Sequence, residues 1–194
     1  MKHSLPDLIE TKRNVHVLYA YGAMQTYLQT VVSYILDSIQ AKETIILIEN
    51  ERIYRQIKKE LQPLLSKKDM EFIHFINSFD FYFSSGSYHP PAIAAYFEKT
   101  VQPYLENQEA FRSWAHVEWS SMEEPHHLID DLEKIIDHAV NELQFPLICA
   151  YKKANMPIQL ETMLIHTHPY KLIENPLLTS VPDPLTVKKR VSQR

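Results

Sequence analysis

Four residues are the first candidates for holding a metal ion or moving protons: His16, Glu118, His166 and His168. Imidazole nitrogens and carboxylate oxygens are ligands of zinc, which prefers a tetrahedral arrangement. The spacing of His166 and His168 suits an extended segment rather than one face of a helix. Because the sequence contains neither an HExxH nor a CxxC pattern, we expect satisfied or exposed histidines and no metal site.

Glu118 stands beside Trp119 and four residues after Trp114. A carboxylate between indole rings can hold a cation through its charge and through the aromatic faces. The same residues can instead form a tryptophan core with a glutamate bonded to neighbouring backbone amides. In an enzyme, Glu118 and His168 would be the acid and base candidates, because the pKa of both side-chain types can be tuned near neutral pH.

The single cysteine, Cys149, lies in the middle of an apolar run. We expect it to be a small buried hydrophobe, because a reactive thiol needs an exposed, electropositive setting. One cysteine excludes an intramolecular disulfide and favours a reducing compartment. The serine-rich stretch at 84–87 lacks the GxSxG pattern of a nucleophile elbow, so it is expected to be a turn.

The turn at Gly22 follows a predicted strand and precedes a predicted helix, where many nucleotide-binding α/β proteins hold phosphate. A phosphate loop of the form GxxxxGK[ST] uses backbone amides, a lysine for the terminal phosphates and a hydroxyl for magnesium. Here Gly22 and Thr26 are present, but the second glycine and the lysine are missing, and no GxGxxG fingerprint occurs. The sequence therefore predicts no nucleotide hydrolysis.

Apolar periodicity predicts strands that alternate with helices. The predicted strands cover residues 15–20, 44–48, 70–76, 114–119 and 145–151, with a further candidate at 171–174. The predicted helices cover residues 24–40, 51–65, 91–105, 125–143 and 157–165. This alternation indicates a three-layer α/β fold, with a mostly parallel central sheet and helices on both faces. We expect residues 1–178 to form one domain and residues 179–194 to form a flexible basic tail.

Ligands of such sheets bind at the carboxyl ends of the parallel strands. The residues that end the predicted strands are mostly aromatic, acidic or amide-bearing: Tyr19, Tyr21, Gly22, Glu49, Asn50, Asn77, Glu118, Trp119, Tyr151 and Lys152. This set suits a small organic molecule or a cation, and it would repel a bare triphosphate.

The composition argues against several classes of protein. With 45% hydrophobic and 23% charged residues, the 194-residue chain is expected to have a packed core. A formal net charge of −4 gives no general basic field for nucleic acid or anionic lipid. Neither an apolar signal-peptide core nor an apolar run of membrane-spanning length occurs in the sequence. We therefore expect a cytoplasmic protein that binds neither nucleic acid nor membrane.

Six motifs occur in an order that resembles one known family. They are HVLYAY at 16–21, SGSYHPPAIAAYFEKTV at 85–101, FRSWAHVEW at 111–119, LICAYKKANMP at 147–157, IHTHP at 165–169 and ENPLL at 174–178. This set resembles the MEDS domain, the methanogen and methylotroph sensory domain named after a regulator of dichloromethane metabolism. The resemblance implies a degenerate RecA- or KaiC-like core without an ATPase loop, in a sensory module often joined to DNA-binding, kinase or anti-sigma domains.

The resemblance and the strand-end rule together give the residues expected to bind ligand: His16, Tyr19, Tyr21, Tyr88, Arg112, Glu118, Trp119, Tyr151 and His168. Cys149 and Pro169 also match the family's motifs. Two positions depart from the family pattern, since Leu18 stands where a cysteine is usual and Val117 where a glycine is usual. These departures weigh against thiol chemistry and close backbone approach at those two positions.

We therefore expect a non-catalytic sensory or regulatory domain, without a cofactor, that binds a small ligand or a partner protein in signal transduction. Binding would shift loop conformations and so alter the affinity for a kinase, a transcription factor or an anti-sigma type partner. A homodimer is a further expectation. Two alternatives stay open: a degenerate RecA-like subunit that binds nucleotide without hydrolysing it, and an enzyme that uses Glu118 and His168 for acid–base chemistry.

Overall fold

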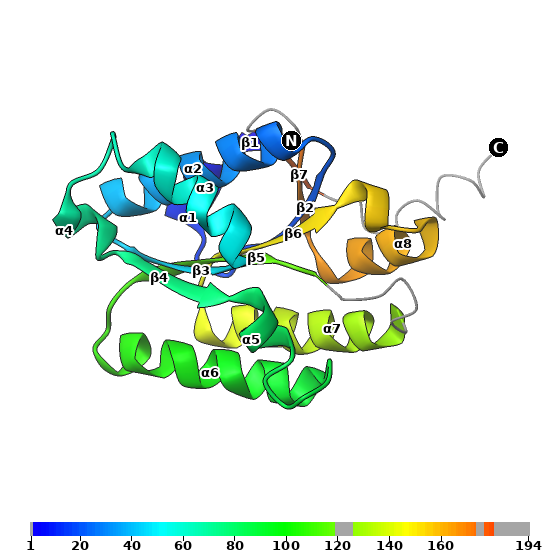
Figure 1. Ribbon diagram of the computed structural model, residues 1–194. Helices are drawn as coiled ribbons and strands as arrows, with labels where there is room; N and C mark the ends of the chain where they lie inside the picture. The colour runs from blue at the N-terminus through cyan, green and yellow to red at the C-terminus, as the bar shows by residue number, and fades with distance from the viewer. Residues whose placement is uncertain (1, 119–125, 174–176, 181–194) are drawn as a thin grey trace.

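The computed structural model describes residues 2–118, 126–173 and 177–180, which form one sheet covered by helices (Figure 1). The strands are β1 (Lys2–Ser4), β2 (His16–Tyr21), β3 (Thr44–Glu49), β4 (Ile73–Asn77), β5 (Phe111–His116), β6 (Leu147–Lys152), β7 (Tyr170–Leu172) and β8 (Leu177–Ser180). The helices are α1 (Leu5–Thr11), α2 (Met24–Gln40), α3 (Glu51–Leu61), α4 (Lys67–Met70), α5 (Ser78–Tyr82), α6 (Pro90–Glu106), α7 (His126–Leu143) and α8 (Ile158–Thr167). None of the helices in these ranges combines the length and the apolar character that crossing a membrane requires.

The strand order of the sheet is β1-β8-β7-β2-β6-β5-β3-β4. The six strands from β7 to β4 run parallel to one another, and β8 and β1 extend the sheet with antiparallel pairs. Parallel neighbours need crossover connections, and the helices between the strands provide them. The predicted α/β fold with a mostly parallel sheet is confirmed.

The fourth predicted strand is displaced along the chain, because β5 covers Phe111–His116 and not 114–119. Arg112 and Ser113 interrupt the apolar pattern, yet both are buried in the strand. Arg112 tolerates burial because its Nε donates to Glu43 Oε2 at 2.6 Å. Trp119 and the tail from residue 181 lie outside the described residues, and β8 spans the domain boundary predicted at residue 178.

Side chains that alternate along the strands enter two separate cores, one on each face of the sheet. Val17, Tyr19 and Tyr21 of β2 pack with α1, α2 and α3 on one face, while Leu18 packs with α5, α6, α7 and α8 on the other. Figure 1 shows α1–α3 above the sheet and α5–α7 below it. A polar residue on a strand therefore reaches one helical layer only.

The connection between β2 and α2 consists of residues 22 and 23 alone. The helix begins directly at Met24, and its N-cap residue Ala23 offers no side-chain hydrogen bond. Leu28, Val31 and Ile35 then recur at helical spacing and bury the helix against the sheet. A connection this short leaves no loop to wrap around a phosphate chain, which agrees with the missing phosphate-loop residues.

Candidate functional site

The carboxyl ends of β3 and β5 bring two acids and one histidine together. We call Glu49, His116 and Glu118 the edge cluster; one ligand atom from each lies within 4.8 Å of the others. Glu49 ends β3 and His116 ends β5. Because β3 and β5 are parallel neighbours, their ends reach the same edge of the sheet.

His116 lies between a carboxylate and a tyrosine. Its Nδ1 is 2.7 Å from Glu49 Oε1, and its Nε2 is 2.9 Å from the hydroxyl oxygen of Tyr21. A carboxylate only accepts hydrogen bonds, so Nδ1 carries the proton that it donates to Glu49. Its Nε2 shares the second hydrogen bond with the Tyr21 hydroxyl. These two bonds fix the orientation of a histidine that is almost completely buried.

Glu49 is completely buried, so its carboxylate depends on internal hydrogen bonds. Oε1 also accepts from the Asn50 backbone amide at 2.7 Å, and Oε2 accepts from the Tyr27 hydroxyl of α2. Trp114 Nε1 donates to the same Tyr27 oxygen at 2.9 Å. Burial, and next the charge of Glu49, raises the pKa of Tyr27 well above its ordinary value, so its hydroxyl remains a donor. The inner part of the edge cluster is therefore a fixed polar network.

Glu118 is the member of the edge cluster that meets solvent, since 40% of its side chain is exposed. Its two oxygens accept from Asn50 Nδ2 at 3.0 and 3.1 Å, and Oε2 also accepts from Ser78 Oγ at 3.1 Å. Its Oε1 lies 3.8 Å from Nδ1 of His116. Glu118 thus presents an oriented carboxylate at the edge of the sheet where ligands of parallel α/β proteins bind.

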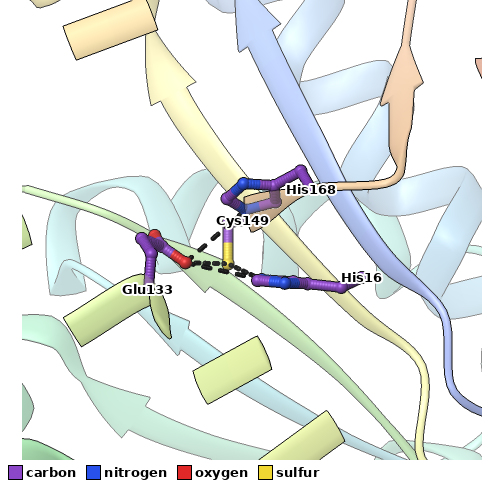
Figure 2. Close-up of side chains that lie close together, drawn as sticks. All are labelled: His16, Glu133, Cys149 and His168. Atoms are coloured by element: carbon purple, nitrogen blue, oxygen red, sulfur yellow. Dashed lines mark hydrogen bonds and ion pairs between the residues drawn. The ribbon is translucent and has the colours of Figure 1, made fainter. Parts of the chain in front are cut away.

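A second group of donors lies on the opposite face of the sheet, between the sheet and α7 (Figure 2). We call it the buried cluster: His16 of β2, Glu133 of α7, Cys149 of β6 and His168, the residue that caps the C-terminus of α8. All four side chains are at least 97% buried. Figure 2 shows the four side chains pointing toward one another from different elements.

Glu133 is the centre of the contacts within the buried cluster. Its Oε2 lies 3.4 Å from Nε2 of His16, 3.5 Å from Nε2 of His168 and 3.7 Å from Sγ of Cys149. Nε2 of His16 is also 3.4 Å from Sγ of Cys149. The other carboxylate oxygen, Oε1, accepts the hydroxyl of Tyr151.

The protonation of the buried cluster follows from these contacts. Burial lowers the pKa of His168 to about 4, and the neighbouring His16 contributes to that shift. Burial opposes the charge on His16 as well, but hydrogen bonds with Asp137 and Glu133 raise its pKa above the ordinary value. Burial alone would raise the pKa of Glu133, yet the two imidazoles and Tyr151 hold it at about 2. These shifts oppose each other in the expected sense for an ion pair: they favour the charged form of the Glu133 carboxylate and the protonated form of His16 beside it.

The structure does not bring all the residues predicted to bind ligand together. Tyr21 and Glu118 belong to or contact the edge cluster, and His16, Tyr151 and His168 belong to or contact the buried cluster. The Tyr19 ring packs against Tyr21 and Tyr27, while its hydroxyl bonds Thr30. Tyr88 stacks on Tyr82, and Arg112 pairs with Glu43. Trp119 lies outside the described residues.

The structure brings together only some of the residues that the sequence analysis considered as metal ligands or acid–base partners. Glu118 and His168 belong to different clusters, so they form no acid–base pair with each other in the described structure. His16 and His168 do meet, with ring centroids 3.9 Å apart. His166 is exposed, and its Nδ1 bonds the carbonyl of Thr162.

Sequence reasoning missed His116, Tyr27 and Glu133. The alternation Trp114, His116, Glu118 indicates one face of an extended segment and could have pointed to His116. Glu133 and Asp137 are four residues apart, so they share one side of a helix. Both acids lie beside the apolar face of α7, and this position could have indicated that they face the sheet.

Fold and site together define a RecA-like α/β domain without a phosphate loop. The structure is similar to a solved structure described as an ATPase domain, with a TM-score of 0.51, 11% sequence identity, and coverage of 82% of this chain and 69% of that chain. At this identity the likeness concerns the fold alone. No match was found among curated proteins.

The family model MEDS, the methanogen/methylotroph, DcmR sensory domain, matches residues 15–169. The chain belongs to the MEDS family of sensory domains.

Proposed function

We propose that the domain senses a small cationic or hydrogen-bond-donating ligand at the edge cluster and acts through recognition rather than turnover. The observation that carries this proposal is the partly exposed carboxylate of Glu118, held by Asn50 and Ser78 at the carboxyl edge of the sheet. A fixed, negatively charged acceptor favours ammonium, alcohol or cation ligands over anions.

Hydrogen bonds inside the edge cluster connect the proposed ligand position to the ends of β3, β5 and α2. Glu118 Oε1 faces His116, which bonds Glu49, and Glu49 accepts from Tyr27 of α2. A cation at Glu118 changes the field at His116 and so favours some arrangements of the β3, β5 and α2 ends over others. A population shift of this kind alters the surface that a partner meets.

We assign the output to a second molecule: a regulatory protein of the kinase, transcription factor or anti-sigma type, or a second copy of this chain. A sensory domain changes behaviour elsewhere only by changing the affinity of an interaction. Light scattering after size-exclusion chromatography, with and without ligand, separates a homodimer from a monomer that needs another partner.

Thermal unfolding with chemical probes tests the ligand class. Methylammonium and tetramethylammonium are expected to raise the melting temperature of the wild-type chain. In Glu118→Gln, which keeps the shape but loses the charge, the shift is expected to disappear. Glu98→Gln on α6 is the matched control, because Glu98 is an exposed glutamate outside both clusters. Equal shifts in all three proteins would contradict the assignment of the site to Glu118.

A further inference from the structure

Four distances between donor atoms of the buried cluster match the edges of a metal coordination tetrahedron. A tetrahedral zinc ion with ligand bonds of about 2.0–2.3 Å separates its ligand atoms by about 3.3–3.8 Å. Four of the contacts among His16, Glu133, Cys149 and His168 measure 3.4, 3.4, 3.5 and 3.7 Å. All four ligand atoms lie within 4.8 Å of one another.

The hydrogen bonds around the cluster orient these atoms inward. Nδ1 of His168 lies 2.8 Å from the Leu164 carbonyl, and Nδ1 of His16 lies 3.1 Å from the Thr167 carbonyl. A carbonyl oxygen only accepts, so both Nδ1 atoms carry protons and both Nε2 atoms are directed at Glu133 and Cys149. Histidine ligands of metals are held in this way by their second nitrogen.

A hydrogen bond orients the carboxylate of Glu133 toward the other donors as well. Tyr151 donates to Oε1 of Glu133, which leaves Oε2 as the atom that faces the other three donors. Asp137 Oδ1, at 3.1 Å from Nδ1 of His16, adds a carboxylate behind that imidazole. Carboxylate–histidine pairs of this kind increase the basicity of a metal-binding ring.

Hydrogen bonds alone leave the cluster incomplete. Nε2 of His168 has no hydrogen-bond partner within the part of the chain that the structure describes. That atom belongs to a completely buried side chain and lies 3.5 Å from a carboxylate oxygen, so its lone pair faces a negative charge. An unsatisfied buried polar atom is costly, and a cation at the centre of the four donors removes the cost.

We propose that His16, Glu133, Cys149 and His168 bind one divalent transition-metal ion, with zinc as the ion that the donor set favours. Two imidazoles, one thiolate and one carboxylate are ligands typical of zinc, whereas calcium and magnesium select oxygen atoms. Binding requires a Cys149 thiolate and an unprotonated Nε2 on His16, so the ion displaces the protons on these two atoms, and the protons go to solvent. This proposal replaces the sequence-based expectation of no metal site, and it does not depend on the ligand proposed at the edge cluster.

Four protein ligands make a closed centre, and closed centres stabilise folds rather than activate water. The ion connects β2, β6, α7 and the end of α8. We therefore expect it to hold α7 and α8 against the sheet. Removing it should lower the melting temperature of the whole domain.

Cobalt(II) gives a decisive spectroscopic test, because Cys149 is the only cysteine of the chain. Metal-free protein titrated with cobalt(II) is expected to show intense visible bands of a tetrahedral ion and a thiolate-to-cobalt charge-transfer band, saturating at one ion per chain. Cys149→Ser should lose the charge-transfer band. His168→Gln should bind more weakly by at least about 100-fold, because even changes in supporting residues lower affinity by about 10- to 100-fold.

His166→Ala is the matched control, because His166 is exposed and only two residues from His168. It should keep both the spectrum and the stoichiometry of the wild-type chain. Circular dichroism establishes that each variant is folded, and the wild-type spectrum decides the question even if a variant fails to fold. The proposal is overturned if the folded wild-type chain yields only the weak bands of hydrated cobalt, or if Cys149→Ser retains the charge-transfer band.

Discussion

At the residue scale, the two clusters differ in how their acids are satisfied. Glu49 accepts from a backbone amide, a histidine and a tyrosine, so its hydrogen bonds are complete without any ligand. Glu133 accepts from Tyr151 but shares its other oxygen with two imidazole nitrogens and a thiol. The first acid is therefore part of a structural network, while the second lies where an ion fits.

The variant Tyr151→Phe removes the one hydroxyl that donates to Oε1 of Glu133 and so measures how much this hydrogen bond contributes to zinc affinity. The ring continues to fill the core, but Oε1 loses its donor and the carboxylate gains freedom to rotate. We expect zinc affinity, measured by competition with a chromophoric chelator, to fall about 10-fold. Tyr170→Phe on β7 is the control, because Tyr170 lies outside the buried cluster, and it should leave the affinity unchanged. An equal fall in both variants would show that Tyr151 acts through general packing.

Glu49→Gln tests the network inside the edge cluster. The amide nitrogen must take one of the two oxygen positions, where it meets a donor: the Asn50 amide and His116 on one side, Tyr27 on the other. A buried polar contact that becomes donor against donor is expected to cost about 1–3 kcal/mol of the free energy of unfolding. Urea denaturation measures it, with the exposed Glu60→Gln as the control. A loss no larger than that of the control would mean that the network contributes nothing to stability.

At the element scale, α7 is the helix that closes the buried cluster. Two adjacent isoleucines mark the buried and the exposed side of this helix. Ile136 faces the core and is 8% exposed, whereas Ile135 is 37% exposed. Ile136→Ala leaves a cavity between α7 and the sheet and is expected to lower the free energy of unfolding by about 2–5 kcal/mol. Ile135→Ala should cost clearly less in the same denaturation experiment. Similar losses would contradict this orientation of α7.

The edge strand β4 carries a pH-sensitive contact. Burial lowers the pKa of His74 below its ordinary value of 6.5, and its Nδ1 is 2.8 Å from the Tyr104 hydroxyl of α6. The unfolded chain therefore binds a proton before the folded chain does, so stability declines as the pH falls below 6.5. Denaturation midpoints across that range should change less in His74→Gln than in the wild-type chain. Parallel pH profiles would assign the decline to other groups.

At the scale of the whole molecule, the sequence predicted what depends on repeated patterns and missed what depends on single contacts. The continuous β-branched run of β3 and the apolar face of α7 were enough to predict a parallel sheet between helical layers. The start of β5 was misplaced because Arg112 is buried through an ion pair that no local pattern reveals. Glu49, Asn50 and Glu118 followed from the strand-end rule, whereas Glu133 did not, since charged residues on helices usually face solvent.

The whole molecule has a RecA-like α/β fold, and its β2–α2 connection makes nucleotide binding the least expected behaviour. Residues 22 and 23 alone join the strand to the helix, and the first turn of α2 contains no lysine. A ligand at about 100 times its Kd stabilises a protein by about 2.7 kcal/mol, and each kcal/mol raises the melting temperature of a domain of this size by about 2–4 °C. Magnesium ATP is therefore expected to leave the melting temperature unchanged, while zinc added to the metal-free chain raises it by several degrees. A comparable shift with ATP, abolished in Thr26→Ala, would show that this shortened turn still seats a nucleotide and that the domain kept the binding half of an ATPase.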